Sequence, residues 1–464
     1  MRPNLLQRTI ISWRPLHVAD PEMRRALWFS FADGLFAVAM IALVETHGIA
    51  ALLTLGASKF EIALLGSIPL LFSALIQLLT PVVAAVITSR RRVVIGAVTG
   101  QCICLLLVAG CGYIGRGIAP LLFVLFYAFY AMSGSFGTGV WSSWMGDLIP
   151  PDIRGRYFAW RNRYFSIVQV LVGVLSGYAV QQISGGVPTW QVFTFVYLVA
   201  TACRIGSVVC LTKQHDPPLT FQPTARDFTY AQFLGKASSS NFARFVIFVA
   251  LVHGTTALSG PFFGVYFLKH LQLPYSTFAL VVNAHLIGTL LMLPFWGGLA
   301  DRYGNWLVVR TTAVGAAIIP FPYLLLTDPV SLWLLGFAAG ALWSAFGLAV
   351  FNYLLDAVTP QRRVRCAAYM GATVGFSVCT FGLLGGWIVN YMRPILFWSS
   401  GYQTLFALSG VLRLTVVGLF LGFGWVREIR AVTPVSLREL FSAFPTVRVP
   451  LDFARYTYRV LRRI

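Results

Sequence analysis

Residues 147–156, DLIPPDIRGR, decide the fold, because the chain repeats their pattern at residues 356–365, DAVTPQRRVR. The aspartate, the second proline and both arginines coincide at a shift of 209 residues. The same shift places Arg204 on Arg413. Polar residues within apolar stretches rarely align in the same order by chance. The sequence therefore predicts two related halves in parallel arrangement.

The composition excludes a soluble enzyme. Of the 464 residues, 58% are hydrophobic and only 11% are charged, whereas soluble domains carry about 25% charged residues. Aromatic residues make up 15% and glycines number 42, which is typical of membrane helices. The net charge of +20 could indicate nucleic acid, but the basic residues stand in short clusters between apolar runs. We therefore expect no nucleic-acid partner.

Twelve apolar runs are long enough to cross a bilayer core of about 30 Å. Nearly continuous apolarity without a two-residue alternation favours helices over a membrane barrel. The sequence therefore predicts an all-α membrane protein whose twelve transmembrane helices form two six-helix halves. The runs cover approximately residues 27–55, 60–87, 93–114, 119–146, 160–182, 190–212, 242–268, 276–299, 306–326, 330–355, 366–391 and 402–426.

The expected domain boundaries follow from these runs. The first half is expected at residues 27–212 and the second at residues 239–427, with a polar, proline-containing linker at residues 213–238. A tail at residues 1–26 precedes the halves. A basic tail at residues 428–464 follows them, and its charge predicts an amphipathic helix lying on the membrane surface.

The basic residues mark one face of the membrane. Of the 35 lysines and arginines, 28 lie in the two tails or in the loops after the even-numbered spans. The positive-inside rule therefore predicts an inner-membrane protein with both termini in the cytoplasm, and an even number of spans agrees. The same residues are expected to contact anionic lipids at the cytoplasmic face.

Cysteines and histidines give no sign of a cofactor. All seven cysteines lie in apolar runs, where small residues pack between helices, and no two histidines stand at ligand spacing on one helix. The sequence indicates no metal site, disulfide framework or phosphate-binding loop. No cofactor is therefore expected.

The stretch GGLADRYGNW, residues 297–306, resembles the loop signature G-x-L-A-D-R-x-G of the major facilitator superfamily. It lies between the eighth and ninth spans, where that family carries it, and the span count and the repeat agree. The resemblance covers nearly the whole chain and implies a cavity between the halves, lined by spans 1, 4, 7 and 10. In the first half, residues 84–92 keep the basic cluster but lack the glycine and the acid.

The signature also implies a cytoplasmic gate. Gly298 is expected to remove bulk where the eighth span approaches a neighbour, and Gly304 to allow a tight reversal. Asp301 is expected to end the helix and to latch onto Arg154 or Arg156 of the opposite half. Ordinary charges near lipid headgroups are the alternative for the whole gating set, which comprises Asp147, Arg154, Arg156, Asp301, Arg302, Asp356, Arg363 and Arg365.

Charges within the spans ask for partners, since a mid-span charge costs roughly 2.5 to 3.5 kcal/mol on insertion scales. Asp33 and Arg204 lie at similar depths of about 10 and 12 Å, so we expect them to pair, as a static clamp or as part of proton coupling. Glu45 lies nearer the opposite face and is expected either to carry a proton or to reach an aqueous cavity. Arg413 has no acid at its depth in the second half.

Aromatic side chains on two of the cavity-lining spans predict an aromatic, largely apolar pocket. Helix packing is the alternative interpretation for these residues, and a core hydrogen bond is the alternative for the histidine. A Gly-Pro pair at 260–261 is expected to interrupt the seventh span. The candidate cavity residues are Tyr127, Tyr130, His253, Trp343 and Phe346.

Together these features predict a secondary active transporter that moves a small organic solute by alternating access, with or without proton coupling. It is expected to function as a monomer and not as an enzyme, since clustered catalytic residues are lacking. The alternative is a protein of the same fold that does not transport and serves as a sensor or assembly factor in a pigment or lipid pathway. Substrate, direction and coupling ion stay open.

Overall fold

The structure is a computed structural model of the 464-residue chain. It describes residues 21–84, 89–115, 117–149, 151–185, 188–215, 229–236, 240–359, 362–394 and 400–429. The described residues form helices and no strands, and 12 of the helical segments are long and apolar enough to cross a membrane. The predicted all-α membrane fold is confirmed.

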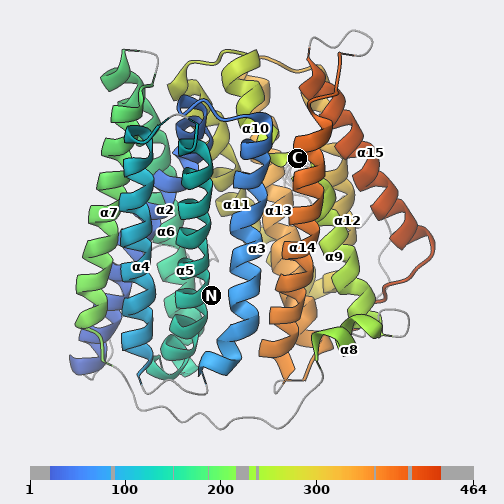
Figure 1. The fold of residues 1–464 in the computed structure, drawn as a ribbon. Helices are drawn as coiled ribbons and strands as arrows, with labels where there is room; N and C mark the ends of the chain where they lie inside the picture. Colours follow the sequence, from blue (N-terminus) through green and yellow to red (C-terminus); the bar gives the residue numbers. More distant parts are fainter. Residues whose placement is uncertain are drawn as a thin grey trace, which may run out of the picture.

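Twelve spans form two groups of six, which lie side by side in Figure 1. The first group comprises α2 (Pro21–Thr54), α3 (Lys59–Ala84), α4 (Arg90–Gly110), α5 (Ala119–Leu148), α6 (Pro151–Ser184) and α7 (Trp190–Thr212). The second comprises α9 (Asn241–Ala257) with its continuation α10 (Gly260–Val265), α11 (Tyr275–Tyr303), α12 (Asn305–Ile318), α13 (Pro329–Ala357), α14 (Arg363–Ile388) and α15 (Gly401–Gly422). A short helix, α8 (Tyr230–Gly235), lies at the side of α14.

The two ends of the helical bundle need names. We call the end at which α7 finishes and α8 begins the linker end, and the opposite end the far end. The fifth span begins where predicted, at Trp160, but its helix α6 starts earlier, directly at Pro151. Proline is well tolerated in the first turn of a helix, where its missing N–H would have no partner in any case. The predicted loop after the fourth span is therefore only a short turn.

The seventh span is interrupted, as the Gly-Pro pair predicts. Helix α9 ends at Ala257 and α10 begins at Gly260, with Pro261 in its first turn. Proline has no N–H to donate to the preceding turn, so the helical hydrogen-bond ladder cannot run through it. Five further residues, Tyr266–His270, form a π-helical turn at the far end.

The halves meet along two helix pairs, α3 with α14 and α6 with α11. Small residues allow these contacts. A Cβ atom on Gly382 would lie 1.8 Å from Ser67 Oγ, and one on Gly177 would lie 2.0 Å from the Ala279 Cβ. Any larger side chain at either glycine would push the two halves apart.

The loop between α11 and α12 confirms one glycine prediction and corrects another. Gly304 adopts φ 90°, a conformation that side chains rarely allow, so it does make the tight reversal. Gly298 has open space where a Cβ would lie among the described residues, so it does not relieve a close approach. Helix α11 instead comes closest to α13 at Gly288 and Gly340, where an added Cβ would lie 2.0 Å from Phe337 O and 1.9 Å from His285 O.

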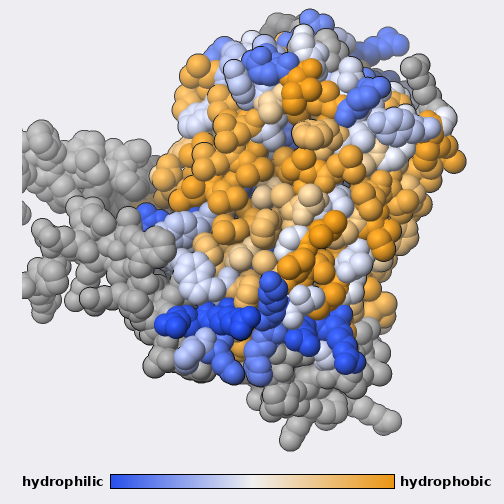
Figure 2. Space-filling view, turned by 90° about the vertical axis from the view of Figure 1, so that its left-hand side faces the viewer, coloured by the Kyte–Doolittle hydropathy of each residue, from blue (hydrophilic) through white to orange (hydrophobic). Residues whose placement is uncertain are grey.

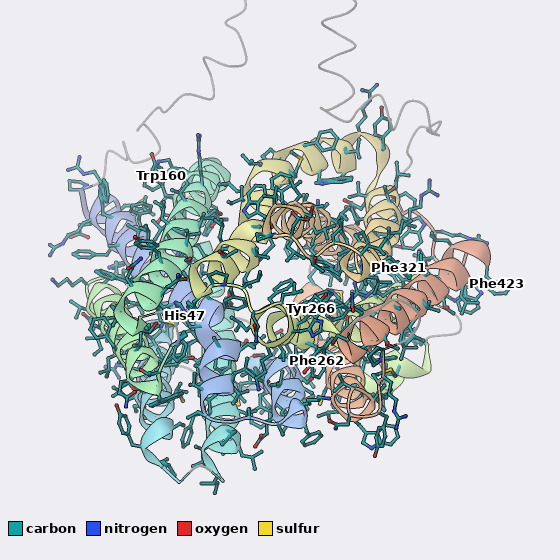
Figure 3. The ribbon with its side chains drawn as sticks, turned by 90° about the horizontal axis from the view of Figure 1, so that it is seen from above. His47, Trp160, Phe262, Tyr266, Phe321 and Phe423 are labelled. Carbon is teal, nitrogen blue, oxygen red and sulfur yellow. The ribbon has the colours of Figure 1, made fainter. Side chains whose placement is uncertain are left out.

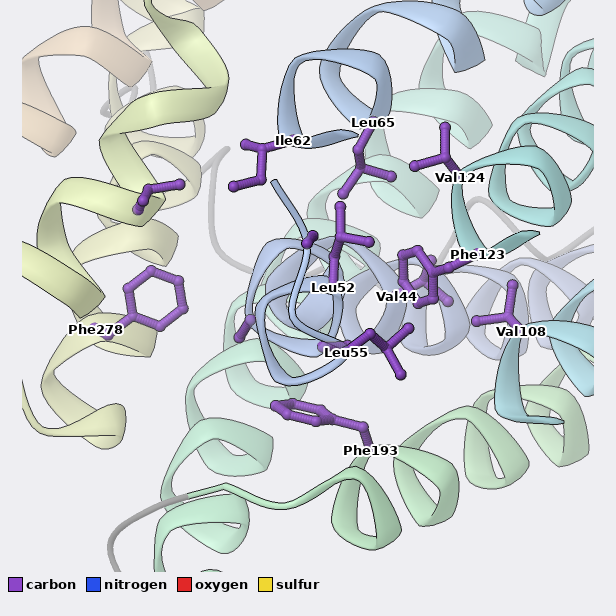
Figure 4. Packing of buried hydrophobic residues seen from close by; sticks show 14 of the residues in the cluster. Val44, Leu52, Leu55, Ile62, Leu65, Val108, Phe123, Val124, Phe193 and Phe278 are labelled. Carbon is purple, nitrogen blue, oxygen red and sulfur yellow. The ribbon is translucent and has the colours of Figure 1, made fainter. Parts of the chain in front are cut away.

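The apolar cores differ between the two ends. The largest buried cluster includes residues of both halves, among them Leu52 and Phe193 from the first half and Phe278 from the second (Figure 4). Towards the linker end each half has its own cluster, one around Trp144 and the other around Tyr353. The halves therefore share an apolar core at the far end, whereas towards the linker end each half has its own core and the halves meet along α3 and α14.

The outward surface is apolar around the middle of the molecule. Figure 2 shows an orange band of hydrophobic side chains with blue, hydrophilic side chains gathered below it. Large apolar residues such as Leu175 and Phe195 are more than half exposed. Contiguous exposed apolar surface of this kind fits contact with lipid rather than water.

Candidate functional site

A cavity of about 410 Å³ lies where the two halves meet. Its lining comes from α2, α5 and α9, the first, fourth and seventh spans, and also from α3, α10 and α14. The second and eleventh spans were not expected there, and α13 contributes no residue to the lining. The lining residues are Glu45, Gly48, Ile49, Leu65, Gly66, Leu70, Tyr127, His253, Thr256, Ala257, Gly260, Pro261 and Val378.

Four polar side chains face this cavity. Thr256 is satisfied locally, because its Oγ1 donates to Val252 O at 2.8 Å. Glu45, Tyr127 and His253 have no hydrogen-bond partner among the residues that the structure describes. Glu45 is exposed to the cavity, whereas Thr46 and His47 beside it are buried. The cavity thus holds three polar groups free to bind a ligand, from three different helices.

The other predicted cavity aromatics lie behind this wall. The Trp343 ring packs 5.1 Å from the His253 ring, and Phe346, which is fully buried, packs at 5.6 Å. Tyr130 is nearly buried, and its hydroxyl donates to Met40 Sδ at 3.1 Å. These three side chains hold the lining residues in place but are not themselves part of the lining.

Asp33 and Arg204 come together, as their depths predict, but through a third residue. Arg204 donates from Nε and Nη2 to Gln101 Oε1, at 2.8 and 2.5 Å, and from Nη1 to Ser207 Oγ at 3.1 Å. Ser207 Oγ in turn donates to Asp33 Oδ1 at 2.5 Å. No direct ion pair joins the two charged groups in the described structure. The hydroxyl of Ser207 is therefore the link between them.

Arg413 is satisfied without an acid. It donates from Nε to Ser409 Oγ at 3.2 Å, from Nη1 to Ala316 O at 3.0 Å and from Nη2 to Ser259 Oγ at 3.2 Å. The two serines continue the chain of donors: Ser259 donates to Ser409 at 3.0 Å, and Ser409 donates to Thr255 O at 2.7 Å. Ser259 is available because it stands at the interruption between α9 and α10.

A hydrogen-bonded group joins the halves at the far end, and we call it the far-end clasp: His47, Ser176 and Tyr275. The buried His47 ring contacts Tyr275 Oη through Nδ1 at 2.5 Å and Ser176 Oγ through Nε2 at 2.9 Å. Ser176 gives its own hydrogen to Gly173 O at 3.1 Å. Nε2 must therefore be the protonated nitrogen, and Nδ1 accepts from Tyr275. Figure 3 labels His47 in a view along the helices.

Three more polar contacts cross between the halves at the same end, and in one of them Lys59 Nζ donates to Val389 O at 3.3 Å. Asn283 Nδ2 donates to Thr46 Oγ1 at 3.3 Å, and the backbone N–H of Ser276 donates to Gln181 Oε1 at 2.6 Å. Together with the shared apolar core, they close the far end over the cavity.

The gate residues are only partly described. Side chains of Asp147, Arg154, Arg156 and Asp301 lie outside the described residues, so the latch stays a prediction. In the second half, Arg363 donates to Leu355 O at 2.9 Å and to Val358 O at 3.2 Å. Asp356 accepts from Asn305 Nδ2 at 2.7 Å. Arg365 is half-buried, and the exposed Arg302 lies over the ring of its neighbour Tyr303 at 5.0 Å.

Arg363 therefore caps the carboxyl end of α13, and Asp356 holds the start of α12. All of these partners belong to the second half, so none of these contacts crosses to the first.

Neutral polar residues are the functional side chains that sequence reasoning missed. Gln101, Ser207, Ser259 and Ser409 complete the two arginine clusters, and Tyr275 completes the far-end clasp. The available signal was a polar residue within an apolar run, since such residues bond to neighbouring helices. Within the described residues, no group of three or more His, Cys, Asp or Glu could hold a metal ion.

Comparisons with known proteins agree with this architecture. The sequence profile of the Major Facilitator Superfamily matches residues 26–255 and residues 245–463. The tetracycline resistance protein, class B, of Escherichia coli is 24% identical over 111 residues, which are 24% of this chain and 27% of that relative. The matched segment thus spans only about a quarter of that relative's length.

Solved structures of transporters share the fold. The nucleoside transporter NupG superposes with a TM-score of 0.66 at 14% identity, covering 88% of this chain and 100% of that chain. The D-xylose-proton symporter gives a TM-score of 0.65 at 15% identity, covering 89% and 100%. A bacterial homologue of the iron transporter ferroportin in the inward-facing state gives 0.62 at 15% identity, covering 86% and 98%. At these identities the likeness shows the fold alone.

Proposed function

Since the chain belongs to the major facilitator superfamily, we propose that it is a secondary transporter that carries a small organic solute across the membrane by alternating access. The observation that carries this proposal is the cavity between the halves, lined by both of them and holding Glu45, Tyr127 and His253, which have no hydrogen-bond partner among the described residues. A site at the interface of two halves is exposed to one side or the other as the halves rock.

The two ends of the molecule support this mechanism. At the far end, the halves share one apolar core and the His47–Tyr275 hydrogen bond. At the linker end, each half packs around its own cluster. Such a molecule can part at the linker end without disturbing either core, and it must break the far-end clasp to open the other way.

Glu45 is the proposed proton carrier. Its carboxylate faces the cavity and no described cation or donor holds it, so protonation is one way to remove the cost of a charge in an apolar site. Proton loading and solute loading then occur in the same space, which is the requirement for coupling them.

The linker end is proposed to face the cytoplasm of a cell with an inner membrane, and the protein is proposed to act as a monomer. The clustering of basic residues at this end supports the orientation. Fusing a fluorescent protein or alkaline phosphatase to the C-terminus tests it. Fluorescence with an inactive phosphatase is expected, and the reverse result overturns the orientation.

Solute flux into proteoliposomes tests the function itself. Purified protein is reconstituted, and uptake of a panel of cationic, neutral and anionic solutes is measured with and without an imposed pH gradient. We expect uptake of at least one solute above empty vesicles, and a pH-gradient dependence that Glu45→Gln abolishes and Glu61→Gln retains. Glu61 is the matched control because it caps the start of α3 and is not part of the cavity lining, and glutamine can cap there as well.

Absence of flux for every solute class overturns the transport proposal. It favours the second candidate, a protein of this fold that senses or assembles without transporting. Flux that ignores the pH gradient, with transport retained in Glu45→Gln, overturns only the proton coupling.

A further inference from the structure

Among the described lining residues, the cavity contains one carboxylate, Glu45, and one titratable base, the His253 imidazole, to which no hydrogen bond from Glu45 is formed. Glu45 is the only Asp or Glu among the described lining residues, and the lining includes no lysine or arginine. The two mid-span arginines are engaged elsewhere: Arg204 bonds Gln101 and Ser207, and Arg413 bonds two serines and a backbone carbonyl. Neither donates to Glu45, so among the described residues no permanently charged side chain balances this carboxylate.

An isolated carboxylate in an apolar cavity carries a large desolvation cost unless something neutralises it. A proton does so, and so does a positively charged ligand. An anionic ligand would instead be repelled by Glu45. A polyhydroxylated ligand such as a sugar would need many donors and acceptors, but only four polar side chains line the cavity, and Thr256 already donates to its own helix.

The remaining wall suits an apolar, aromatic body. Ile49, Leu65 and Leu70 lie on the first-half side of the lining, and Pro261 and Val378 lie on the second-half side. The ring of Tyr127 lines the cavity as well. Phe123 stacks behind that ring at 6.0 Å with an interplanar angle of 27°, so the ring is held in a fixed orientation. A fixed electron-rich face close to a carboxylate attracts cations further.

The second half offers an aromatic surface as well. His253 presents its ring to the cavity, and Trp343 packs behind it at 5.1 Å. An aromatic ring of a ligand that lies between Tyr127 and His253 would contact both halves at once. Its charge would then lie at the Glu45 side of the cavity.

From this arrangement we infer that the cavity binds organic monocations of aromatic character, with the cationic centre at the Glu45 carboxylate. The inference rests on the proposed function for its biological meaning, but the binding itself can be measured without transport. At about 410 Å³ the cavity falls within the range of sites for drug-sized molecules.

A pair of ions with the same shape and opposite charge tests the inference. Tetraphenylphosphonium is a permanent cation, and tetraphenylborate is its anionic counterpart. Equilibrium binding of each ion to purified protein in nanodiscs is measured with empty nanodiscs as the blank. We expect wild type to bind the phosphonium at least about tenfold more tightly than the borate, since even one screened charge contact is worth that much. Equal affinities, or a preference for the borate, overturn the inference.

The same assay on two variants locates the charge contact. Glu45→Gln is expected to weaken phosphonium binding by about tenfold or more and to abolish the preference over the borate. Glu61→Gln is expected to bind both ions as wild type does. An unchanged preference in Glu45→Gln overturns the assignment to this carboxylate. Thermal unfolding of each variant shows whether it is folded, and the wild-type preference needs no variant at all.

Failure of this inference and failure of the proposed function are distinguishable. If proteoliposomes transport a neutral or anionic solute while neither ion binds at Glu45, transport holds and the cation assignment is overturned. If the phosphonium binds with the expected preference but no solute crosses the membrane, the site stands and the transport proposal is overturned.

Discussion

Arg204 and Arg413 occupy corresponding positions on the last helix of each half, yet the two halves satisfy them differently. Arg204 bonds the Gln101 side chain of α4 and is linked through Ser207 to Asp33. Arg413 bonds a backbone carbonyl of α12, at Ala316, and two serines. Helices α4 and α12 are the third spans of their halves. The arginine of the first half therefore donates to an amide side chain of this span, and the arginine of the second half donates to a backbone carbonyl of it.

The difference teaches that the repeat preserves a buried cation but not its counter-charge. In the first half a carboxylate lies two hydrogen bonds away, and the buried Arg161 also interacts with it, so removing the carboxylate leaves two cations uncompensated. In the second half only neutral dipoles hold the arginine, and the interruption between α9 and α10 supplies one of them, Ser259. The two clusters should therefore respond in opposite ways to loss of charge.

Removing the acid of the first-half cluster should have the largest effect. Asp33→Leu leaves Arg204 buried without its carboxylate, and breaking a buried pair in this way costs about 3 to 5 kcal/mol. Thermal unfolding in detergent, followed by tryptophan fluorescence, is expected to show a clear fall in melting temperature. The control, Glu61→Leu at the exposed start of α3, should change far less. Equal melting temperatures for wild type and Asp33→Leu would contradict the role assigned to this carboxylate.

Coupling between the two charges should be the next largest effect. Asp33→Asn and Arg204→Gln, measured singly and together, form a double-mutant cycle, and residues in one hydrogen-bond network couple by about 0.5 to 3 kcal/mol. The double variant is expected to be more stable than the sum of the single effects implies, because each single variant leaves one charge of the Asp33–Arg204 network without the other. Additive effects within the error of the unfolding measurement would show that Ser207 does not transmit the interaction.

Removing the cation separates the two halves most directly. Arg413→Met takes away a buried charge that has no described acid, keeps most of the volume and leaves the two serines bonded to each other and to Thr255 O. The expected change is within about 1 kcal/mol, and stabilisation is possible since a packed apolar side chain can replace buried charge without loss. Arg204→Met, which removes the larger of the two favourable charge interactions of the buried Asp33, should be markedly worse. Equal losses of stability in Arg413→Met and Arg204→Met would show that the two clusters do not differ in their need for a buried counter-charge.

The far-end clasp joins the two halves, whereas each arginine cluster lies within one half. Loss of the clasp should therefore change the free energy of unfolding little and should instead favour opening of the far end. Tyr275→Phe removes one hydrogen bond to His47, worth about 0.5 to 1.5 kcal/mol net. Labelling of a cysteine placed at Gly260 by an impermeant thiol reagent applied at the far end is expected to quicken by up to about tenfold.

Tyr266→Phe is the matched control for this last test, because the buried Tyr266 hydroxyl at the same end has no partner in the described structure. It should leave labelling unchanged. Similar acceleration in both variants would mean that the clasp does not hold the far end closed.

Part of this architecture can be predicted from the sequence, because it depends only on the length of the apolar runs and on the depth of the charged residues within them. Spans follow from apolar runs, and the neighbourhood of Asp33 and Arg204 follows from their matching distances to the membrane surface. The interruption near Pro261 follows from its missing N–H. Each of these features is local, so no knowledge of helix orientation is needed to predict it.

The remainder depends on which face each helix turns inward. Leu65 and Val378 line the cavity, but similar apolar residues on α3 and α14 face lipid, and nothing in their composition tells the two apart. The partner of Arg413 at Ala316 is a backbone carbonyl, which leaves no side-chain signature. The prediction for Gly298 was wrong in another way. The signature motif suggested a close helix contact at Gly298, but α11 makes its close contact with α13 at Gly288.

Helix α2 runs without interruption for 34 residues, or about 51 Å at the α-helical rise, and it carries Asp33, Glu45 and His47. One continuous hydrogen-bond ladder makes this helix stiff, so a displacement of one of these three residues should be accompanied by a displacement of the other two. Gly34 lies tightly against Phe165, where an added Cβ would come within 2.0 Å of the ring, and Gly48 is in ordinary van der Waals contact with Tyr127. We therefore expect a ligand that displaces α2 at Glu45 to displace Asp33 towards the linker end and His47 towards the far end as well.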